Sequence, residues 1–481
     1  MQQTQTFLFY DLETYGLHPQ VDRITQFACV RTNEDLVPIG EPLVLFCKLT
    51  EDYLPEIEAS LVHGITPKFV MENGISEYEF AKKIHKEFSI PNTCVVGYNN
   101  IRFDDEFIRN LFYRNFFDPY YREWANGNSR WDIIDLIRLV HDLRPEGINW
   151  VINEDNKPSF RLEELTVANN LEHADAHDAL SDVYATIALL KLIKEMQPKT
   201  FSFFYANRFK QEILKLVYRS PEDIFVHTSN MFTSVNGCTT LMTPLMRHPK
   251  NNNCVLAYDL RYSPNELINS STIDIEKRLF TRDLANEQRI HVKGVHINKC
   301  PIVAPIDVVD EASLKRLNID IVTCKDNLKL IEKNKEAIKE KLTIIYEKEI
   351  DINVSEIDPE RQIYSGGFFD DKDKQMLAQI HSTKPEKLLN LKNKFLDKRI
   401  SELLWRFVAR NFPEVLSKED SIKWKKFCED RLINPMIDEK PDIFVYKEKL
   451  ETILSGQLSE RDQNVLSSLS SYVNSLETSL K

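Results

Sequence analysis

The sequence predicts a three-part protein of mixed α/β class, with an alternating α/β domain over 1–197, a region of short strands over 198–350 and a helical domain over 354–481. Three observations lead to this prediction. In the first part, apolar runs of strand length alternate with helical patterns. After Pro198 the strand-like runs are shorter and separated by turns. In the last part, apolar residues recur at helical spacing.

The composition is that of an ordinary globular protein, because hydrophobic residues make up 42% and charged residues 28% of the 481 positions. At a formal net charge of −12, a nucleic acid would have to bind in a local basic groove. The eight cysteines are scattered without a Cys-x-x-Cys pair, which argues against a zinc site or a disulfide scaffold and favours a reducing, cytoplasmic location. The sequence shows no signal-peptide pattern, no apolar run long enough to span a membrane and no glycine-rich nucleotide loop.

The first strand carries two acids at its end. The apolar run 7–10 predicts a buried strand, and Asp11 and Glu13 then follow at a spacing that points both side chains to one face. Thr14 and Gly16 end the strand, which places the pair at the rim of a sheet. Like charges held together there repel, and Mg²⁺ or Mn²⁺ is the usual remedy. Taken alone, such a pair is more often a solvated strand end than a metal site.

The next elements bring a third acid to a strand end. Strands are predicted at 24–30, 43–49 and 93–98, and helices are predicted from Pro67 and over 81–88. The strand at 93–98 runs into Asp104, which falls in the first turn of a further helix. Asp105 is the alternative acid at this point.

The segment 109–138 interleaves aromatic and basic side chains. Such a pattern is typical of a channel for single-stranded nucleic acid, in which bases stack on aromatic rings and arginines neutralise phosphates. Most of these aromatic residues are assigned to the core, and Tyr120 and Trp124, in a predicted loop, are assigned to a ligand.

A long apolar helix is predicted after residue 178. His177 precedes it and Asp182 lies in its early turns, so both can face one site. Alanines at its start allow it to approach the sheet closely. His173 and Asp178 are the alternatives, and a histidine near a helix start is more often a surface or capping residue.

The remaining elements are short strands and helices. Strands are predicted at 255–260, 290–297 and 302–304, and a helix over 334–347. At 290–293 apolar residues alternate with basic ones. This pattern fits a phosphate-facing wall and a solvated polar face equally well. A further amphipathic helix is predicted between Asp397, as its cap, and Pro413, which ends it. The lysine-rich stretch 384–399 is more simply a solvated face than a DNA contact.

Asp-x-Glu on a first strand, Asn-x-x-Phe-Asp after a later strand and His-x-x-x-x-Asp on a closing helix together resemble the DEDD superfamily of 3′→5′ exonucleases, in its histidine subtype. The resemblance implies a ribonuclease H-like α/β exonuclease domain. It implies that two Mg²⁺ ions, with Mn²⁺ as a substitute, are held by Asp11, Glu13, Asp104 and Asp182, and that His177 is the general base. Spacing to the neighbouring motif residues favours Asp104 over Asp105, Asp182 over Asp178 and His177 over His173.

Further stretches look like bacterial exonuclease I, and they lie at 98–105, 128–132, 143–150, 158–163, 296–301 and 409–413. This resemblance implies that an SH3-like β barrel and an α-helical C-terminal domain follow the exonuclease domain. It implies that the substrate is contacted by Glu13 and Arg161, and that the DNA path is lined by Arg109, Tyr120, Trp124, Arg138 and Arg144.

The expected function is therefore a single-stranded-DNA-specific 3′→5′ exodeoxyribonuclease that releases 5′-mononucleotides, acts in DNA repair and recombination, and works as a monomer. The family also implies binding of the C-terminal tail of single-stranded-DNA-binding protein. Two alternatives remain. An RNA-trimming or proofreading DEDD nuclease is disfavoured by the long chain beyond the first domain, and a catalytically silent DNA-binding scaffold is disfavoured because all five catalytic positions hold competent residues.

Overall fold

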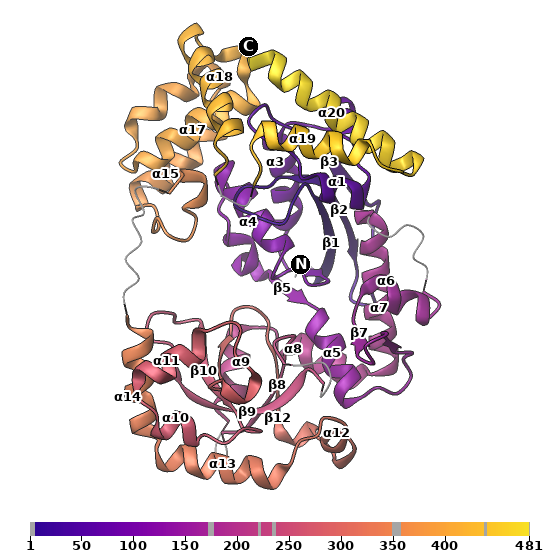
Figure 1. Cartoon of the computed structure of the whole chain (residues 1–481), viewed down its shortest axis with the longest axis vertical. Helices are drawn as coiled ribbons and strands as arrows, with labels where there is room; N and C mark the ends of the chain where they lie inside the picture. Colours follow the sequence, from indigo (N-terminus) through magenta and orange to yellow (C-terminus); the bar gives the residue numbers. More distant parts are fainter. Residues whose placement is uncertain are drawn as a thin grey trace.

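The structure is a computed structural model, and it describes residues 5–171, 178–219, 223–232, 237–348, 357–436 and 440–480. Two five-stranded sheets and a group of helices form its three parts (Figure 1). The α/β part lies in the middle of the view, the second sheet lies below it, and the C-terminal helices lie above and beside it. This is the mixed α/β class that the sequence predicts.

The first sheet has the strand order β3-β2-β1-β4-β5, in which β1 pairs antiparallel with β2 and parallel with β4. Its central strand is the one that ends in the two acids. The strands are β1 (Thr6–Thr14), β2 (Ile24–Thr32), β3 (Leu43–Phe46), β4 (Thr93–Gly97) and β5 (Ser129–Asp132). The strand predicted at 43–49 is thus shorter in the structure.

Helices cover both faces of this sheet. Leu8 and Tyr10 of β1 pack against α3 and α4, whereas Phe7 and Phe9 point to the opposite face, where α7 lies across β1 and β2. The helices of this part are α1 (Ile57–His63), α2 (Pro67–Asn73), α3 (Glu77–Phe88), α4 (Asp104–Arg114), α5 (Ile134–Leu143), α6 (Leu162–Ala168) and α7 (Ala179–Met196). Between them lie the short 3₁₀ helices η1 (Tyr121–Glu123) and η2 (Ala125–Gly127) and the strand pair β6 (Val151–Ile152) and β7 (Pro158–Ser159).

The second sheet is antiparallel throughout, with the order β11-β10-β9-β8-β12. Its strands are β8 (Phe225–Thr228), β9 (Thr239–Arg247), β10 (Cys254–Asp259), β11 (Val292–His296) and β12 (Ile302–Pro305). Helices surround it: α8 (Pro198–Ala206), α9 (Lys210–Val217), α10 (Asn265–Asn269), α11 (Thr272–Phe280), α12 (Glu311–Arg316), α13 (Ile321–Lys333) and α14 (Lys335–Tyr346), with η4 (Asn286–Gln288) and η5 (Ile306–Val308).

The sequence prediction missed β8, β9 and most helices of this region. In β9 the reason is chemical: Thr239, Thr240 and Thr243 are buried, so the strand shows no clear apolar alternation although it lies inside the sheet. The buried threonine hydroxyls are hydrogen-bonded, as when Thr240 Oγ1 donates to Asp259 Oδ1 at 2.7 Å.

The C-terminal part is helical, as predicted. Its elements are η7 (Pro359–Arg361), α15 (Asp371–Ile380), α16 (Pro385–Leu388), η8 (Leu389–Lys394), α17 (Lys398–Asn411), η9 (Pro413–Val415), α18 (Lys418–Ile433), α19 (Ile443–Leu454) and α20 (Glu460–Leu480). Asp397 caps α17 by accepting from the Arg399 amide at 2.9 Å, and the helix ends before Pro413, as the sequence predicts.

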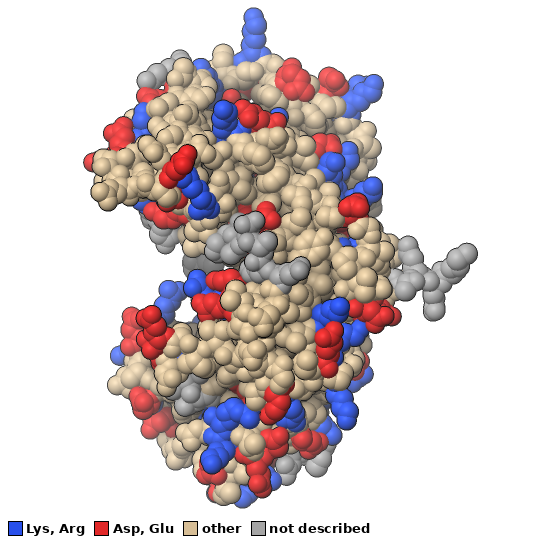
Figure 2. Space-filling view, turned by 90° about the vertical axis from the view of Figure 1, so that its right-hand side faces the viewer, with Lys and Arg blue, Asp and Glu red and all other residues tan. Residues whose placement is uncertain are grey.

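The chain finally returns to its beginning, because α20 packs against α1 and α2, and α17 packs against α3. On the face of the molecule shown in Figure 2, acidic and basic side chains are interspersed. Among the described residues, no helix is both long enough and apolar enough to cross a membrane.

Candidate active site

Three carboxylates meet where β1 ends beneath α7. Asp11 and Glu13 continue the face of β1 that Phe7 and Phe9 begin, so they point toward α7 rather than toward α3 and α4. Asp182 lies in the first turn of α7. One ligand oxygen from each of these three residues lies within 4.8 Å of the others. The structure thus brings together residues that are far apart in the sequence.

The start of α7 is fixed to the sheet by hydrogen bonds. Asp178 caps the helix by accepting from the Ser181 amide at 3.1 Å, and it also accepts from Gln26 Nε2 of β2 at 2.8 Å. Asp178 therefore holds the helix end that carries Asp182. Its role in the structure is capping, which agrees with the preference of the sequence analysis for Asp182 as the ligand.

The fourth predicted acid, Asp104, stands at the N-terminus of α4 and is buried. Burial raises its pKa well above the usual value, and Asp105 and Asp132 add to this effect. Asp104 in turn raises the pKa of both Asp11 and Glu13 through its charge, so it faces the same cluster.

The cluster is electrostatically strained without a counter-ion. Burial and the nearby carboxylates of Asp182, Asp104 and Asp178 raise the pKa of Glu13 to about 9. Burial, with Asp104 and Asp182 next in order, also raises the pKa of Asp11 well above its usual range. A set of carboxylate oxygens at the buried rim of a sheet suits a hard divalent cation, which would reverse these shifts.

Asp105, the alternative to Asp104, has another role. Its carboxylate is fully buried and accepts hydrogen bonds from Tyr10 Oη at 2.7 Å, from Arg122 at 2.6 Å and from Arg130 at 2.8 Å. Burial alone would raise the pKa of Asp105, but the two guanidinium groups hold it below its usual range. Asp105 is thus engaged in ion pairs beneath the site.

Asp132, at the end of β5, is a supporting residue that sequence reasoning did not single out. Its carboxylate accepts from the amides of Asn99 at 2.9 Å and Ile101 at 3.1 Å, in the loop that leads to Asp104. Burial raises its pKa to about 6. The available signal was another acid directly after a buried strand.

The aromatic and basic segment is divided between core and surface. Phe112, Phe116 and Trp131 are buried, as expected for most of its aromatic residues. Trp124, between η1 and η2, has 68% of its surface exposed and touches Tyr121 edge to face. It is therefore available to a ligand.

The predicted arginines differ in their surroundings. Arg109 is buried and paired with Glu106 at 2.7 Å and Glu123 at 2.8 Å, and its guanidinium lies 5.3 Å from the centre of the Tyr120 ring. Its charge is balanced within the fold. The Arg109 side chain therefore supports the Tyr120 ring from within the fold.

Two other arginines of the α/β part differ in exposure, and Arg138 is the more buried, with 11% of its side chain exposed. Arg138 is paired with Asp135 at 2.5 Å and lies over Phe160. Arg161 is exposed and paired with Glu163 at 3.1 Å, a contact that water weakens.

Arg144 has a different position from the other predicted arginines. It donates to the Val308 carbonyl at 2.7 Å and so joins the α/β part to the second sheet's part. His177 and His173 lie outside the described residues, so the predicted general base stays a prediction.

On the second sheet, the alternation at 290–293 does not give a solvated face. Lys293 is half-buried, and its buried ammonium lies 4.1 Å from the centre of the Phe232 ring. Burial lowers its pKa to about 7. His291 instead stacks on Tyr262, with ring centres 3.5 Å apart.

Family comparisons cover nearly the whole chain. A model described as "Exonuclease" matches residues 8–190, "Exonuclease I SH3-like domain" matches 208–348, and "Exonuclease I C-terminal domain" matches 357–476. Together they confirm the predicted fold class, whereas the predicted boundaries at 197 and 350 stay predictions.

Curated relatives that match most of this chain carry the name exodeoxyribonuclease I. That of Haemophilus influenzae is 47% identical over 431 residues, which are 89% of this chain and 90% of the relative. That of Escherichia coli K12 is 43% identical over 424 residues, which are 88% of this chain and 89% of the relative.

Solved structures agree with these relatives. E. coli exonuclease I in complex with a dA16 oligonucleotide matches with a TM-score of 0.93 at 40% identity, over 98% of this chain and all of that one (100%). Exonuclease I from Methylocaldum szegediense matches with a TM-score of 0.92 at 42% identity, over 98% of this chain and 99% of that one. A zinc-bound form of the E. coli enzyme with single-stranded DNA matches with a TM-score of 0.91 at 39% identity, over 99% and 100%.

Proposed function

The chain belongs to the exonuclease I family, and from this premise we propose that it is a single-stranded-DNA-specific exodeoxyribonuclease that digests from the 3′ end and releases 5′-mononucleotides by two-metal-ion hydrolysis. The observation that carries the proposal is the cluster of Asp11, Glu13 and Asp182, whose ligand oxygens lie within 4.8 Å of one another. A family member that had lost activity would have no need to keep this buried repulsion.

Asp11, Glu13, Asp104 and Asp182 would hold two Mg²⁺ ions, for which Mn²⁺ can substitute. When bound, the ions would acidify the attacking water and neutralise charge on the scissile phosphate and the leaving oxygen. The donor set fits, because it consists of carboxylate oxygens crowded at a buried site, where burial and mutual repulsion raise the pKa of Asp11 and Glu13. The relative with zinc bound is in accord with a divalent cation here.

His177 would accept the proton of the attacking water. Imidazole suits this role because its ordinary pKa, near 6.5, allows it to take up a proton at neutral pH. The carboxylates are less suitable, since their oxygens are engaged as ligands. His177 precedes Asp182 by five residues, so it belongs to the same end of α7 in sequence.

The DNA strand would reach the site past the aromatic segment. The exposed ring of Trp124 supplies a stacking surface, Tyr120 is held by Arg109, and the guanidinium groups of Arg138 and Arg161 can balance phosphates. Glu13 would also contact the terminal nucleotide. That E. coli exonuclease I was crystallised with oligonucleotides supports a single-stranded substrate.

The wider biological proposal follows the family. We infer a monomer that acts in DNA repair and recombination and binds the C-terminal tail of single-stranded-DNA-binding protein. A reducing cytoplasm is the proposed location, supported by eight cysteines that are all buried and free.

End-labelled substrates test the proposal. A single-stranded oligonucleotide labelled at its 3′ end should lose the label at once as a mononucleotide, whereas the same oligonucleotide labelled at its 5′ end should shorten step by step. EDTA should stop both reactions, and a fully paired duplex should resist. Immediate release of the 5′ label, internal fragments, or equal digestion of the matching RNA would contradict the proposal.

A further inference from the structure

The turn between β1 and β2 begins directly after Glu13, and its conformation sets where β1 ends. Register between the two strands shifts at this point, from Glu13 opposite Gln26 to Thr14 opposite Ile24. Across the turn, the Tyr15 amide donates to the Arg23 carbonyl at 2.9 Å. Whatever holds the turn therefore also holds the last residues of the acidic strand.

Asp22 is the centre of this turn. Its fully buried carboxylate accepts from the His18 amide at 2.9 Å and from Tyr53 Oη at 2.9 Å. The turn is wrapped tightly around it, because a Cβ on Gly16 would lie only 2.2 Å from Asp22 Oδ2. A buried carboxylate also needs a positive partner, and Lys440 provides one through Nζ contacts of 2.7 and 2.8 Å.

Lys440 belongs to the C-terminal part, far from the turn in sequence, and it also pairs with Glu56 at the start of α1. The contact therefore joins the C-terminal helices to the turn that follows the acidic strand. Lys440 is partly buried, which makes the ion pair stronger than one on the open surface.

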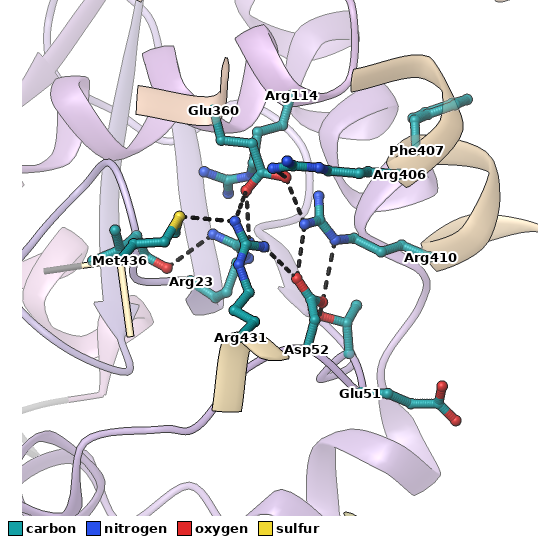
Figure 3. A network of polar contacts seen from close by, with 12 residues as sticks. Arg23, Glu51, Asp52, Arg114, Glu360, Arg406, Phe407, Arg410, Arg431 and Met436 are labelled. Atoms are coloured by element: carbon teal, nitrogen blue, oxygen red, sulfur yellow. Dashed lines mark hydrogen bonds and ion pairs between the residues drawn. The ribbon is translucent and has the colours of Figure 1, made fainter. Parts of the chain in front are cut away.

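The neighbouring residue of the turn is held in the same way. Arg23 donates to Glu360 Oε2 at 3.3 Å, and Glu360, also of the C-terminal part, is fully buried (Figure 3). Arg410 and Arg431 reach Glu360 from α17 and α18, and both also pair with Asp52 of the α/β part. Figure 3 shows these side chains converging on the two carboxylates from opposite parts of the chain.

We propose that Lys440 and Glu360 form a clamp, acting through Asp22 and Arg23, by which the C-terminal part positions Glu13 in the metal site. Lys440, Glu360, Asp22 and Arg23 are positioning residues, because none of them belongs to the acidic cluster. The inference rests on the proposed function, in which Glu13 is a metal ligand. It assigns the C-terminal helices a part in the metal site in addition to any contact with DNA.

The test compares Lys440→Gln with wild type in the full-length protein. Direct Mn²⁺ binding is measured by calorimetry without DNA, the maximal single-turnover rate is measured on a saturating single-stranded oligonucleotide, and DNA affinity is measured in EDTA. We expect Mn²⁺ affinity to fall by about 10-fold, as when a residue that supports a metal ligand is removed. The rate should fall similarly, and DNA affinity should not change. Lys440→Arg should restore most of the metal affinity.

Lys449→Gln is the matched control. Lys449 is a lysine of the same C-terminal part that pairs with Glu58 of α1 across the same boundary, but its pair is exposed and does not touch the turn. It should bind Mn²⁺ and cleave as wild type does. Asp22→Asn keeps the shape of the side chain and removes the charge that pairs with Lys440. It serves as the second test should Lys440→Gln fail to fold.

The outcomes separate the clamp from the proposed function. If wild type binds no Mn²⁺, the proposed metal site itself is wrong. If wild type binds Mn²⁺ and folded Lys440→Gln and Asp22→Asn bind it equally well, the clamp is wrong and Lys440 serves only the stability of the fold. A loss of DNA affinity in EDTA with unchanged metal affinity would also overturn it.

Discussion

Glu13 is a residue whose surroundings require a positive partner, since it is buried among carboxylates that raise its pKa. Glu13→Ala should abolish cleavage and leave binding of single-stranded DNA largely intact, because affinity comes from phosphate and stacking contacts elsewhere. Product assays and gel shifts on the purified variant check this. Activity above about a tenth of wild type would remove Glu13 from the site, and Glu79→Ala, which alters an exposed acid, should behave as wild type.

The proposed role of His177 as the general base leads to a second prediction. His177→Asn should slow the chemical step by about 100-fold or more, and the acidic limb of the pH–rate profile should disappear because no group near pH 6.5 remains to be deprotonated. Single-turnover rates across about pH 5.5–9 decide it. His173→Asn serves as the comparison. An unchanged profile in His177→Asn, with only weaker DNA binding, would make His177 a binding residue.

The raised pKa values of Asp11 and Glu13 predict how the protein responds to pH. For Glu13 the folded-state pKa is about 9 and the usual value is 4.5, so between these values the cation-free folded state binds more protons than the unfolded chain. The free energy of unfolding that comes from binding these extra protons is present at low pH. It is lost as the pH rises from 4.5 to about 9. A divalent cation must displace the protons, so its binding tightens over the same range.

The measurable result is a Tm difference. The increase in Tm on adding Mg²⁺ should be larger at about pH 8.5 than at about pH 6.5. In Glu13→Gln, which cannot titrate, the increase should depend less on pH. An increase that is equal at both values, or larger at the lower one, would contradict the assignment of these carboxylates to a cation.

At the scale of elements, the short 3₁₀ helices around Trp124 form the part of the aromatic segment that is available to DNA. Trp124→Ala should weaken binding of an oligonucleotide by about 1–3 kcal/mol if one base stacks there. Its Tm should not change, because the ring is 68% exposed. Phe444→Ala is the control, since this ring on α19 is 64% exposed and belongs to no predicted DNA contact. A loss of Tm with normal affinity would make Trp124 a structural residue.

Elements with a strong local pattern could be predicted from the sequence, and those shaped by burial of polar groups could not. The run 7–10 and the cap and stop of α17 are local features, and the structure has them as expected. β9 was missed because its buried threonines obscure the apolar pattern. Asp105 differs from Asp104 because it forms ion pairs with Arg122 and Arg130. These pairs join residues distant in sequence, so no local pattern could predict them.

At the scale of the whole molecule, buried ion pairs join the C-terminal part to the α/β part. Arg410 pairs with Asp52 at 2.8 Å and with Glu360 at 2.5 Å, and all three side chains are almost fully buried. Arg410→Ala would leave two buried carboxylates with less compensation, so the free energy of unfolding should fall by about 3–5 kcal/mol. Urea denaturation measures the change. Lys374→Ala, which removes an exposed pair with Asp371, should cost less than about 0.5 kcal/mol. If both variants lowered the free energy of unfolding equally, the buried ion pairs of Arg410 would not hold the two parts together.

The return of the last helices to α1 and α2 has a consequence for protein synthesis. A ribosome releases the strand with Asp11 and Glu13 long before Lys440 and α20 (Glu460–Leu480). The nascent nuclease therefore lacks the clamp on its β1–β2 turn until residue 440 has been synthesised. Nascent chains stalled before residue 440 should be cut by protease within residues 15–23, where the released protein resists. Full nuclease activity would then appear only after Lys440 has left the ribosome and paired with Asp22.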